Sequence, residues 1–240
     1  LPVRNLQLSL SLEVALGIVM FSYLLAAAFN LRIPHTGAHY PQQETHPIRL
    51  VLDFSHCFVS LWKDRLGQIS LAVTTLFWGA GATLQFIVIK WAQVALNMNL
   101  SQGAILQAIS AVGVAGGAVW AAARVPLRKS LNVLPYGVAM GLVVCVMAVY
   151  HSDMLPDTTI MTLGNIQVSL NLLPAYFLLV VVGWLAGYFV VPMNALLQHR
   201  GHVLMSAGHS IAVQNFNENI SVLMMLAIYS LLIWFDIPIQ

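Results

Sequence analysis

The sequence predicts an all-α membrane protein with six transmembrane helices. Of its 240 residues, 59% are apolar and only 8% are charged, and the mean hydropathy of the chain is +0.82. These values lie far outside the range of soluble domains. A helix that crosses a bilayer needs about 20 mainly apolar residues, and six stretches of the chain meet that requirement. They cover residues 11–31, 68–96, 101–123, 131–150, 172–198 and 207–235.

The composition argues against several other classes of protein. The formal net charge is only +2, so the chain lacks the basic surface of a nucleic-acid-binding protein. Cys57 and Cys145 are too few for a disulfide framework. His199, His202 and His209 are spaced irregularly, with no acid or thiol beside them, so we expect no metal site. We find no nucleophile, acid–base pair or glycine-rich phosphate loop, and we therefore expect neither a cofactor nor an enzyme.

The basic residues fall in alternate connections between the predicted spans. They follow the first, third and fifth spans and are Arg32, Arg49, Lys63, Arg65, Arg124, Arg128, Lys129 and Arg200, whereas the connections 97–100 and 151–171 contain no Lys or Arg. Because basic connections stay in the cytoplasm, we expect both ends of the chain on the outer side. The chain starts there without Met or a signal peptide, so we expect it to be a segment of a longer protein.

Residues 32–66 form the one long connection, and its second part has the pattern of an amphipathic helix. Apolar side chains between residues 48 and 66 share one helical face, namely Leu50, Phe54, Phe58, Leu61 and Trp62. Charged side chains occupy much of the remaining surface. A helix of this kind either lies on the cytoplasmic leaflet or packs against the cytoplasmic ends of its own protein, and the pattern fits both equally.

Three of the predicted spans carry two glycines four residues apart. The pairs are Gly113 and Gly117, Gly137 and Gly141, and Gly183 and Gly187. Because missing side chains let helices approach closely inside a membrane, we expect a compact bundle whose helices slide or rock against one another. Gly79 and Gly81 are expected to act likewise in the second span, and Pro192 is expected to kink the fifth.

The last span carries a polar cluster near the centre of the membrane. Its members are Gln214, Asn215, Asn217, Glu218 and Asn219, and Glu218 lies about 17 Å along the span from its cytoplasmic end. A carboxylate and four amides are costly to bury in hydrocarbon, and a polar face of about 140° is too wide for one neighbouring helix. We therefore expect part of this face to line a cavity. The alternative is a structural network that holds the helix in place.

Two polar residues interrupt the second span. Gln85 and Lys90 lie five residues apart, about 140° around a helix. Lys90 is about 10 Å from the predicted outer end of the span, so its ammonium group either faces a substrate or reaches the lipid headgroups. Asn194 and Gln198 of the fifth span are interpreted as polar groups that pack between helices.

Three separated stretches carry motifs of a known family, in order and at the right spacing. They are residues 75–84 (TLFWGAGATL), 189–198 (FVVPMNALLQ) and 211–219 (IAVQNFNEN). These stretches closely resemble the bacterial lysophospholipid transporters, which belong to the major facilitator superfamily. The likeness extends over spans two to six and, more weakly, over span one.

The resemblance implies a fold of twelve helices and a place for this chain within it. The first span would be helix six, and the other five would be helices seven to eleven. Residues 1–31 would then be the last helix of the N-terminal half, residues 32–66 the cytoplasmic loop between the halves, and residues 67–240 the C-terminal transport half without its last helix. Residues 123–129 (ARVPLRK) are similar to a degenerate form of the superfamily's basic loop motif.

The resemblance also implies a substrate and partners. Lysophospholipids, such as those with ethanolamine or glycerol headgroups, would move from the outer to the cytoplasmic leaflet of the bacterial inner membrane. An acyltransferase–acyl carrier protein synthetase would re-acylate them there. The remaining helices of the same transporter and the membrane lipids would be the other partners. The alternative is a major facilitator exporter or importer of a small polar solute or drug.

The candidate substrate-binding residues lie in the second and last spans. They are Gln85, Lys90, Gln214, Asn215, Glu218 and Asn219. In one respect the chain departs from the family, whose members carry Arg at the position of Gln85. An Arg fork suits a phosphate group, and the Gln amide lacks its charge. An intramembrane enzyme would need a second acid, base or nucleophile facing Glu218, and the sequence offers none.

Overall fold

The computed structural model describes residues 12–33, 46–156, 158–163 and 166–235, and nearly all of them are helical. The chain divides into two units, Leu1–Thr45 and His46–Gln240. In the first unit, helix α1 (Leu12–Asn30) coincides with the first predicted span. Its apolar part, Leu16–Asn30, is shorter than the candidate spans of the second unit.

The second unit contains the other predicted spans. Within the part of the chain that the structure describes, five helical segments are long and apolar enough to cross a membrane. They are α3 (Arg65–Val94), α4 (Leu100–Arg124), the 3-10 helix η1 (Leu127–Val133) continued by α5 (Leu134–Val149), α6 (Leu173–Leu204) and α7 (Ala207–Trp234). The prediction of an all-α membrane protein is thereby confirmed. The helices α3 and α6 extend further toward the predicted cytoplasmic side than the apolar runs alone indicated.

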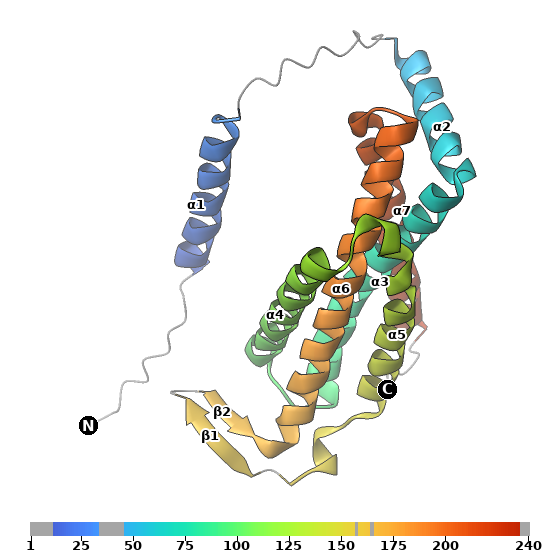
Figure 1. The fold of residues 1–240 in the computed structure, drawn as a ribbon. Coiled ribbons are helices and arrows are strands. Elements are labelled where there is room, and N and C mark those ends of the chain that lie inside the picture. The colour runs from blue at the N-terminus through green and yellow to red at the C-terminus, as the bar shows by residue number, and fades with distance from the viewer. Residues whose placement is uncertain (1–11, 34–45, 157, 164–165, 236–240) are drawn as a thin grey trace. The chain divides into compact units, whose positions relative to one another are not determined.

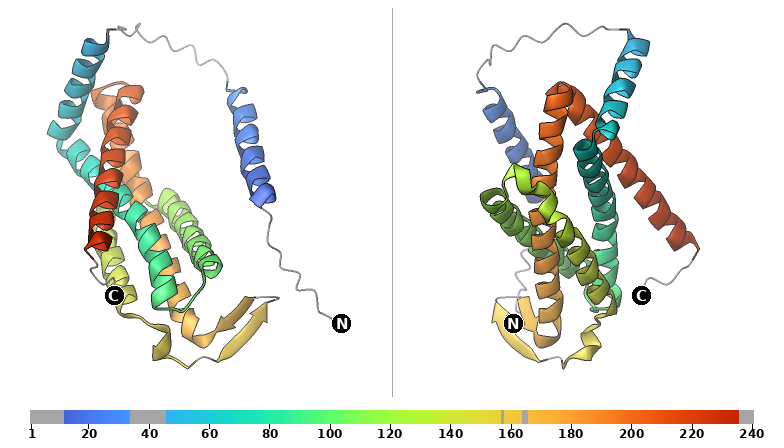
Figure 2. Two further views of the ribbon diagram at one scale, coloured as in Figure 1. Left: turned by 180° about the vertical axis from the view of Figure 1, so that it is seen from behind. Right: turned by 45° about the vertical axis from the view of Figure 1, so that its right-hand side comes forward.

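Helix α6 lies at the centre of the second unit and touches α3, α4, α5 and α7 (Figure 1). The view in Figure 2, turned by 45°, shows α7 diverging from α6, with α3 between them. The Pro192 ring does not end α6, which continues to Leu204. The other four candidate spans of the second unit therefore all contact one long helix.

Glycines bring the backbones of α4 and α6 into close contact. A Cβ atom on any of four residues would overlap a backbone carbonyl of the facing helix, and these residues are Gly113, Gly117, Gly183 and Gly187. A side chain on Gly117, for example, would collide with the carbonyl of Trp184. Two of the predicted glycine pairs thus face each other, and the backbones of α4 and α6 are in direct contact.

The remaining glycines differ in their surroundings. Gly79 lies against Ser221 of α7, and a Cβ on Gly137 would come within 2.8 Å of the Phe189 ring of α6. Gly81 and Gly141 have no such neighbour within 4 Å. The i, i+4 spacing is the same in the pair Gly137 and Gly141 as in the α4 pair, but only one member of it meets another helix.

The connection between α5 and α6 is more ordered than a plain loop. After the 3-10 helix η2 (Ser152–Met154), the strands β1 (Thr159–Leu163) and β2 (Ile166–Ser169) pair in an antiparallel hairpin. A second short 3-10 helix, η3 (Leu170–Leu172), leads into α6. Figure 1 shows the hairpin at the end of the bundle away from α2. The sequence did not predict these strands.

The predicted amphipathic helix is present as α2 (Pro47–Lys63). Phe54 and Phe58 meet the ring of Phe216 on α7 edge-on, with centroids 5.1 and 6.3 Å apart, and Leu61 is fully buried. These contacts favour packing against the protein's own helices for that face. Other apolar side chains of α2, such as Val51 and Val59, are exposed.

A charged corner joins α2, α3 and α6. The Asp64 carboxylate accepts a hydrogen bond from the Gly67 amide (2.8 Å) and so caps the first turn of α3. It also accepts two hydrogen bonds from Arg200, from Nε at 2.9 Å and from Nη2 at 2.6 Å. The hydrogen bond from Arg200 is the main cause that lowers the pKa of Asp64 below its ordinary value, although partial burial opposes it.

We expect Gly117→Ala to destabilise the protein by about 1–3 kcal/mol, because the new methyl group overlaps the Trp184 carbonyl of a backbone that has no room to retreat. Gly141→Ala is the matched control, since its Cβ enters open space and alanine favours a helix over glycine by about 1 kcal/mol. Thermal unfolding in detergent, followed by circular dichroism, measures both. Equal stability of the two variants would contradict the tight α4–α6 contact.

The Asp64–Arg200 pair predicts how stability depends on pH. Because the pKa of Asp64 is lowered in the folded state, its contribution is fully present above the ordinary Asp pKa of about 4 and disappears as the pH falls through the lower folded-state value. Asp64→Asn keeps a helix cap but loses the charge, so we expect a loss on the order of 1 kcal/mol at neutral pH. This difference from wild type should shrink on acidification in thermal unfolding. Asp53→Asn on the exposed side of α2 is the control.

Candidate functional site

The polar cluster of α7 extends to α6 through hydrogen bonds. Gln214 lies one turn before Glu218, and its Nε2 donates to Glu218 Oε1 at 2.8 Å. The same Nε2 lies 3.4 Å from Oδ1 of Asn194 on α6. The structure thus brings together two of the predicted substrate-binding residues and adds a third side chain from another helix.

The side chains of this network become more exposed from Gln214 to Glu218. Gln214 and Asn217 are each only 9% exposed, and Asn217 donates to the carbonyl of Val213 one turn earlier, at 2.8 Å. Glu218 is half-buried, and the Gln214 amide reaches only one of its carboxylate oxygens. Glu218 therefore lies at the boundary between the packed interior and the surface, where a further hydrogen-bond donor has access to it.

The other two asparagines of the cluster lie on an exposed part of α7. Asn215 and Asn219 are both exposed, and Asn219 Nδ2 donates to the backbone carbonyl of Asn215 at 2.7 Å. They extend the polar surface beside Glu218 without entering its hydrogen-bond network. The polar face of α7 is therefore divided into a buried part that contacts α6 and an exposed part.

The two predicted residues of α3 lie apart from this cluster. The carbonyl of Gln85 accepts a hydrogen bond from Gln107 of α4 (2.9 Å), so Gln85 lies where α3 meets α4. Lys90 is exposed and follows, by one turn, the Phe86 ring, which stacks on Tyr229 of α7. Tyr229 is eleven residues beyond Glu218, about 16 Å along the helix. The six predicted residues thus do not form one compact site.

Asn194 is the member of the network that the sequence does not place among the substrate-binding candidates. Its interpretation as a polar group that packs between helices agrees with the hydrogen bond that it accepts from Gln214 of α7. The contact between Asn194 and Gln214 could have been predicted from the short turn between α6 and α7, which contains only Met205 and Ser206. In antiparallel helices joined by so short a turn, residues at similar distances from it lie at similar depth. Asn194 lies eleven residues before Met205 and Gln214 eight residues after Ser206, so their depths differ by less than one helical turn.

The network offers hydrogen-bond acceptors and one carboxylate to a ligand. Glu218 can accept from a hydroxyl or an ammonium group, and the amides can donate to or accept from polar headgroup atoms. Among the described residues, no group of three or more His, Cys, Asp or Glu side chains is placed to hold a metal ion. The arrangement suits polar recognition of a ligand beside otherwise apolar helices.

Comparisons with known proteins identify similar transporters. The chain is 38% identical over 227 residues to the lysophospholipid transporter LplT of Escherichia fergusonii and to that of Shigella boydii, and over 226 residues to that of Citrobacter koseri. Each match covers 94% of this chain and 52% of the relative. No protein-family model matches the chain, and no solved structure does.

The matches cover nearly all of this chain but only part of each relative. The chain spans about half the length of the curated relatives that it matches. The alignment runs through nearly all of the chain, including the apolar helices and the polar cluster of α7. This chain is thus a multi-pass membrane protein that is similar, along nearly its whole length, to about half of the lysophospholipid transporter LplT.

Proposed function

We propose that this chain works as part of a lysophospholipid transporter of the major facilitator type. It would move lysophospholipids from the outer to the cytoplasmic leaflet of the bacterial inner membrane, where a separate acyltransferase–acyl carrier protein synthetase re-acylates them. The similarity to lysophospholipid transporters over 94% of the chain is the observation that carries this proposal. Because these relatives are named as transporters, we assign the chain no enzymatic step.

The polar network of α6 and α7 forms one wall of the headgroup path in this proposal. Glu218 accepts a hydrogen bond from a headgroup hydroxyl or ammonium, and Gln214 keeps its carboxylate oriented through their 2.8 Å hydrogen bond. Exposed apolar side chains of α3 and α7, such as Phe86 and Ile220, provide surface for the acyl chain. The relatives are about twice as long as the matched region, and we place the opposite wall on helices outside this sequence.

The proposed orientation follows from the basic residues. Arg200 and the basic residues before α3 and after α4 lie on the cytoplasmic side. The hairpin β1–β2 and the turn between α3 and α4 lie on the periplasmic side. Both ends of the given sequence then face the periplasm, as does the end of the bundle where a lysolipid from the outer leaflet enters. Movement proceeds by alternating access between two halves.

Lysolipid uptake and re-acylation in spheroplasts that express the protein at its natural length test this function. We expect Glu218→Gln to lower the initial rate about ten-fold, because a charged hydrogen-bond acceptor becomes neutral. Asp53→Asn, a carboxylate on exposed α2, is the matched control. Unchanged uptake in Glu218→Gln would show that transport does not depend on the charge of Glu218. Uptake of a sugar or drug without any lysolipid would refute the substrate class.

The chain carries Gln85 at a position where the family resemblance places Arg. We expect Gln85→Arg to lower the KM for lysophospholipids several-fold, because a guanidinium group binds phosphate oxygens in a bidentate manner. Gln85→Met has a similar length and no charge and should not show this effect. An unchanged KM in Gln85→Arg would mean that the phosphate does not pass this part of α3.

A further inference from the structure

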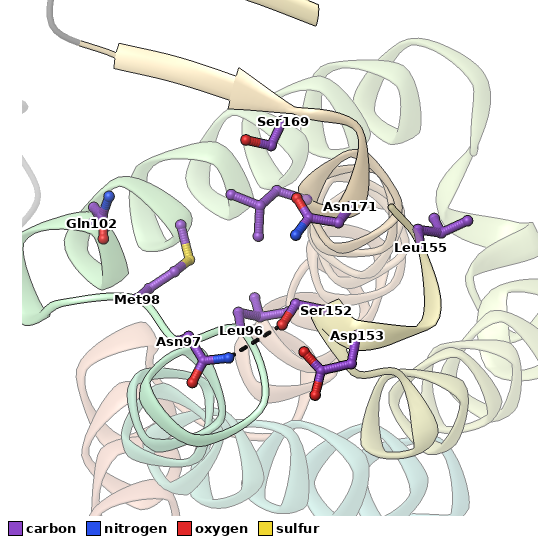
Figure 3. Close-up of a pocket in the computed structure, with 10 residues that line it drawn as sticks. Leu96, Asn97, Met98, Gln102, Ser152, Asp153, Leu155, Ser169 and Asn171 are labelled. Carbon is purple, nitrogen blue, oxygen red and sulfur yellow. Dashed lines mark hydrogen bonds between the residues drawn. The ribbon is translucent and has the colours of Figure 1, made fainter. Parts of the chain in front are cut away.

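A polar pocket lies at the end of the bundle away from α2. It has a volume of about 300 Å³ and is formed by the turn between α3 and α4 and by η2 and η3 of the connection before α6. Figure 3 shows Asn97, Ser152 and Asp153 along one side of it and Ser169 and Asn171 across from them. This pocket is distinct from the network around Glu218, which none of its lining residues belongs to.

Hydrogen bonds between distant segments hold the walls of this pocket in place. Ser152 donates its backbone N–H to the carbonyl of Ala95 (2.9 Å), and Trp91 Nε1 donates to the carbonyl of Tyr150 (3.3 Å). The Tyr150 hydroxyl in turn donates to the backbone carbonyl of Asn171. The α3–α4 turn, η2 and η3 are thereby connected to one another, so the pocket is formed before any ligand arrives.

The turn between α3 and α4 depends on an unusual backbone conformation. Asn97 has a φ of 53°, in the left-handed region that Asn tolerates better than most residues. Its side chain donates toward Ser152 Oγ at 3.5 Å, which connects this turn to η2. Leu96 and Met98, on either side of it, are buried and form an apolar floor.

The chemistry of the lining selects a particular kind of ligand. Asp153 is the charged residue among the side chains that line the pocket, and neither Lys nor Arg is among them. Within the described residues, Oδ1 of Asn171 is buried without a hydrogen-bond partner. Gln102 Oε1 accepts from the Asn99 amide (2.9 Å), which leaves the Gln102 Nε2 hydrogens for another acceptor. The pocket thus combines one anion with neutral donors and acceptors.

We propose that this pocket binds a primary ammonium group joined to a phosphate ester, as in a phosphoethanolamine headgroup. The carboxylate of Asp153 pairs with the ammonium, and the Gln102 amide donates to an ester oxygen. The inference rests on the proposed transport of lysophospholipids and adds a receiving site at the outer leaflet. Without a cation in the lining, an anionic glycerol headgroup gains no ion pair here and is repelled by Asp153.

Binding to the protein in nanodiscs tests the site directly. The probes are lysophosphatidylethanolamine, its soluble headgroup glycerophosphoethanolamine, and lysophosphatidylglycerol, each titrated by calorimetry against wild type and Asp153→Asn. We expect Asp153→Asn to weaken both ethanolamine probes about ten-fold and to strengthen the binding of lysophosphatidylglycerol, because the repulsion by the carboxylate is removed. Asp53→Asn is the control for a lost surface carboxylate. Equal binding of the ethanolamine probes to wild type and Asp153→Asn would overturn the inference.

Comparing the lipid with its soluble headgroup shows whether the pocket binds a lipid or a soluble phosphoethanolamine compound. We expect lysophosphatidylethanolamine to bind more tightly than glycerophosphoethanolamine, because its acyl chain adds apolar contact at the rim of the pocket. Equal affinities would make a soluble phosphoethanolamine compound the ligand and would overturn the lipid assignment.

Transport in spheroplasts distinguishes failure of this inference from failure of the proposed function. Asp153→Asn should lower the ratio of ethanolamine to glycerol lysolipid uptake, and Asp153→Lys should invert the preference. If wild type transports both lipids and neither variant alters the ratio, the pocket has no role in selection although the transport function stands. If wild type transports neither lipid, the transport function fails, and with it the role of the pocket as a receiving site.

Discussion

The direct contact between the backbones of α4 and α6 determines how the rest of the bundle is arranged. Inside a membrane, apolar surface gains little by leaving lipid for another helix, so close packing must supply the attraction. Gly113 and Gly117 allow α4 to lie in the space that Gly183 and Gly187 leave on α6. With this pair fixed, α6 presents Asn194 toward α7 and Phe189 toward α5. The polar network and the helix packing therefore depend on the same four missing side chains.

The part of the fold that follows from local composition could be predicted from the sequence. Apolar runs and the position of basic residues are properties of single stretches, and five of the predicted spans coincide with long apolar helices. Spacing alone could not tell which glycine pairs meet another helix, because this depends on how each helix is rotated. Gly141 has open space around it, whereas Gly117 touches backbone, although both belong to pairs with the same spacing.

The candidate site was predicted only in part for the same reason. Gln214 and Glu218 are one turn apart, so their pairing follows from helical geometry. The contribution of Asn194 and the ion pair between Asp64 and Arg200, which are 136 residues apart in sequence, require the tertiary arrangement. The pocket at the other end of the bundle likewise combines side chains from separate connections, none of which carries a recognisable motif.

Because α6 continues through Pro192 as one helix, it can tilt as a single body. Its 32 residues span about 48 Å; one end follows η3 and Asn171, and the other carries Arg200. A tilt of about 10° around the middle would move each end by about 4 Å in opposite directions. Since α4 is held against α6 by backbone contact, it would turn with it. A tilt of α6 as one body would therefore move the lining of the pocket near Asn171 and the Arg200 side chain that binds Asp64 at the same time.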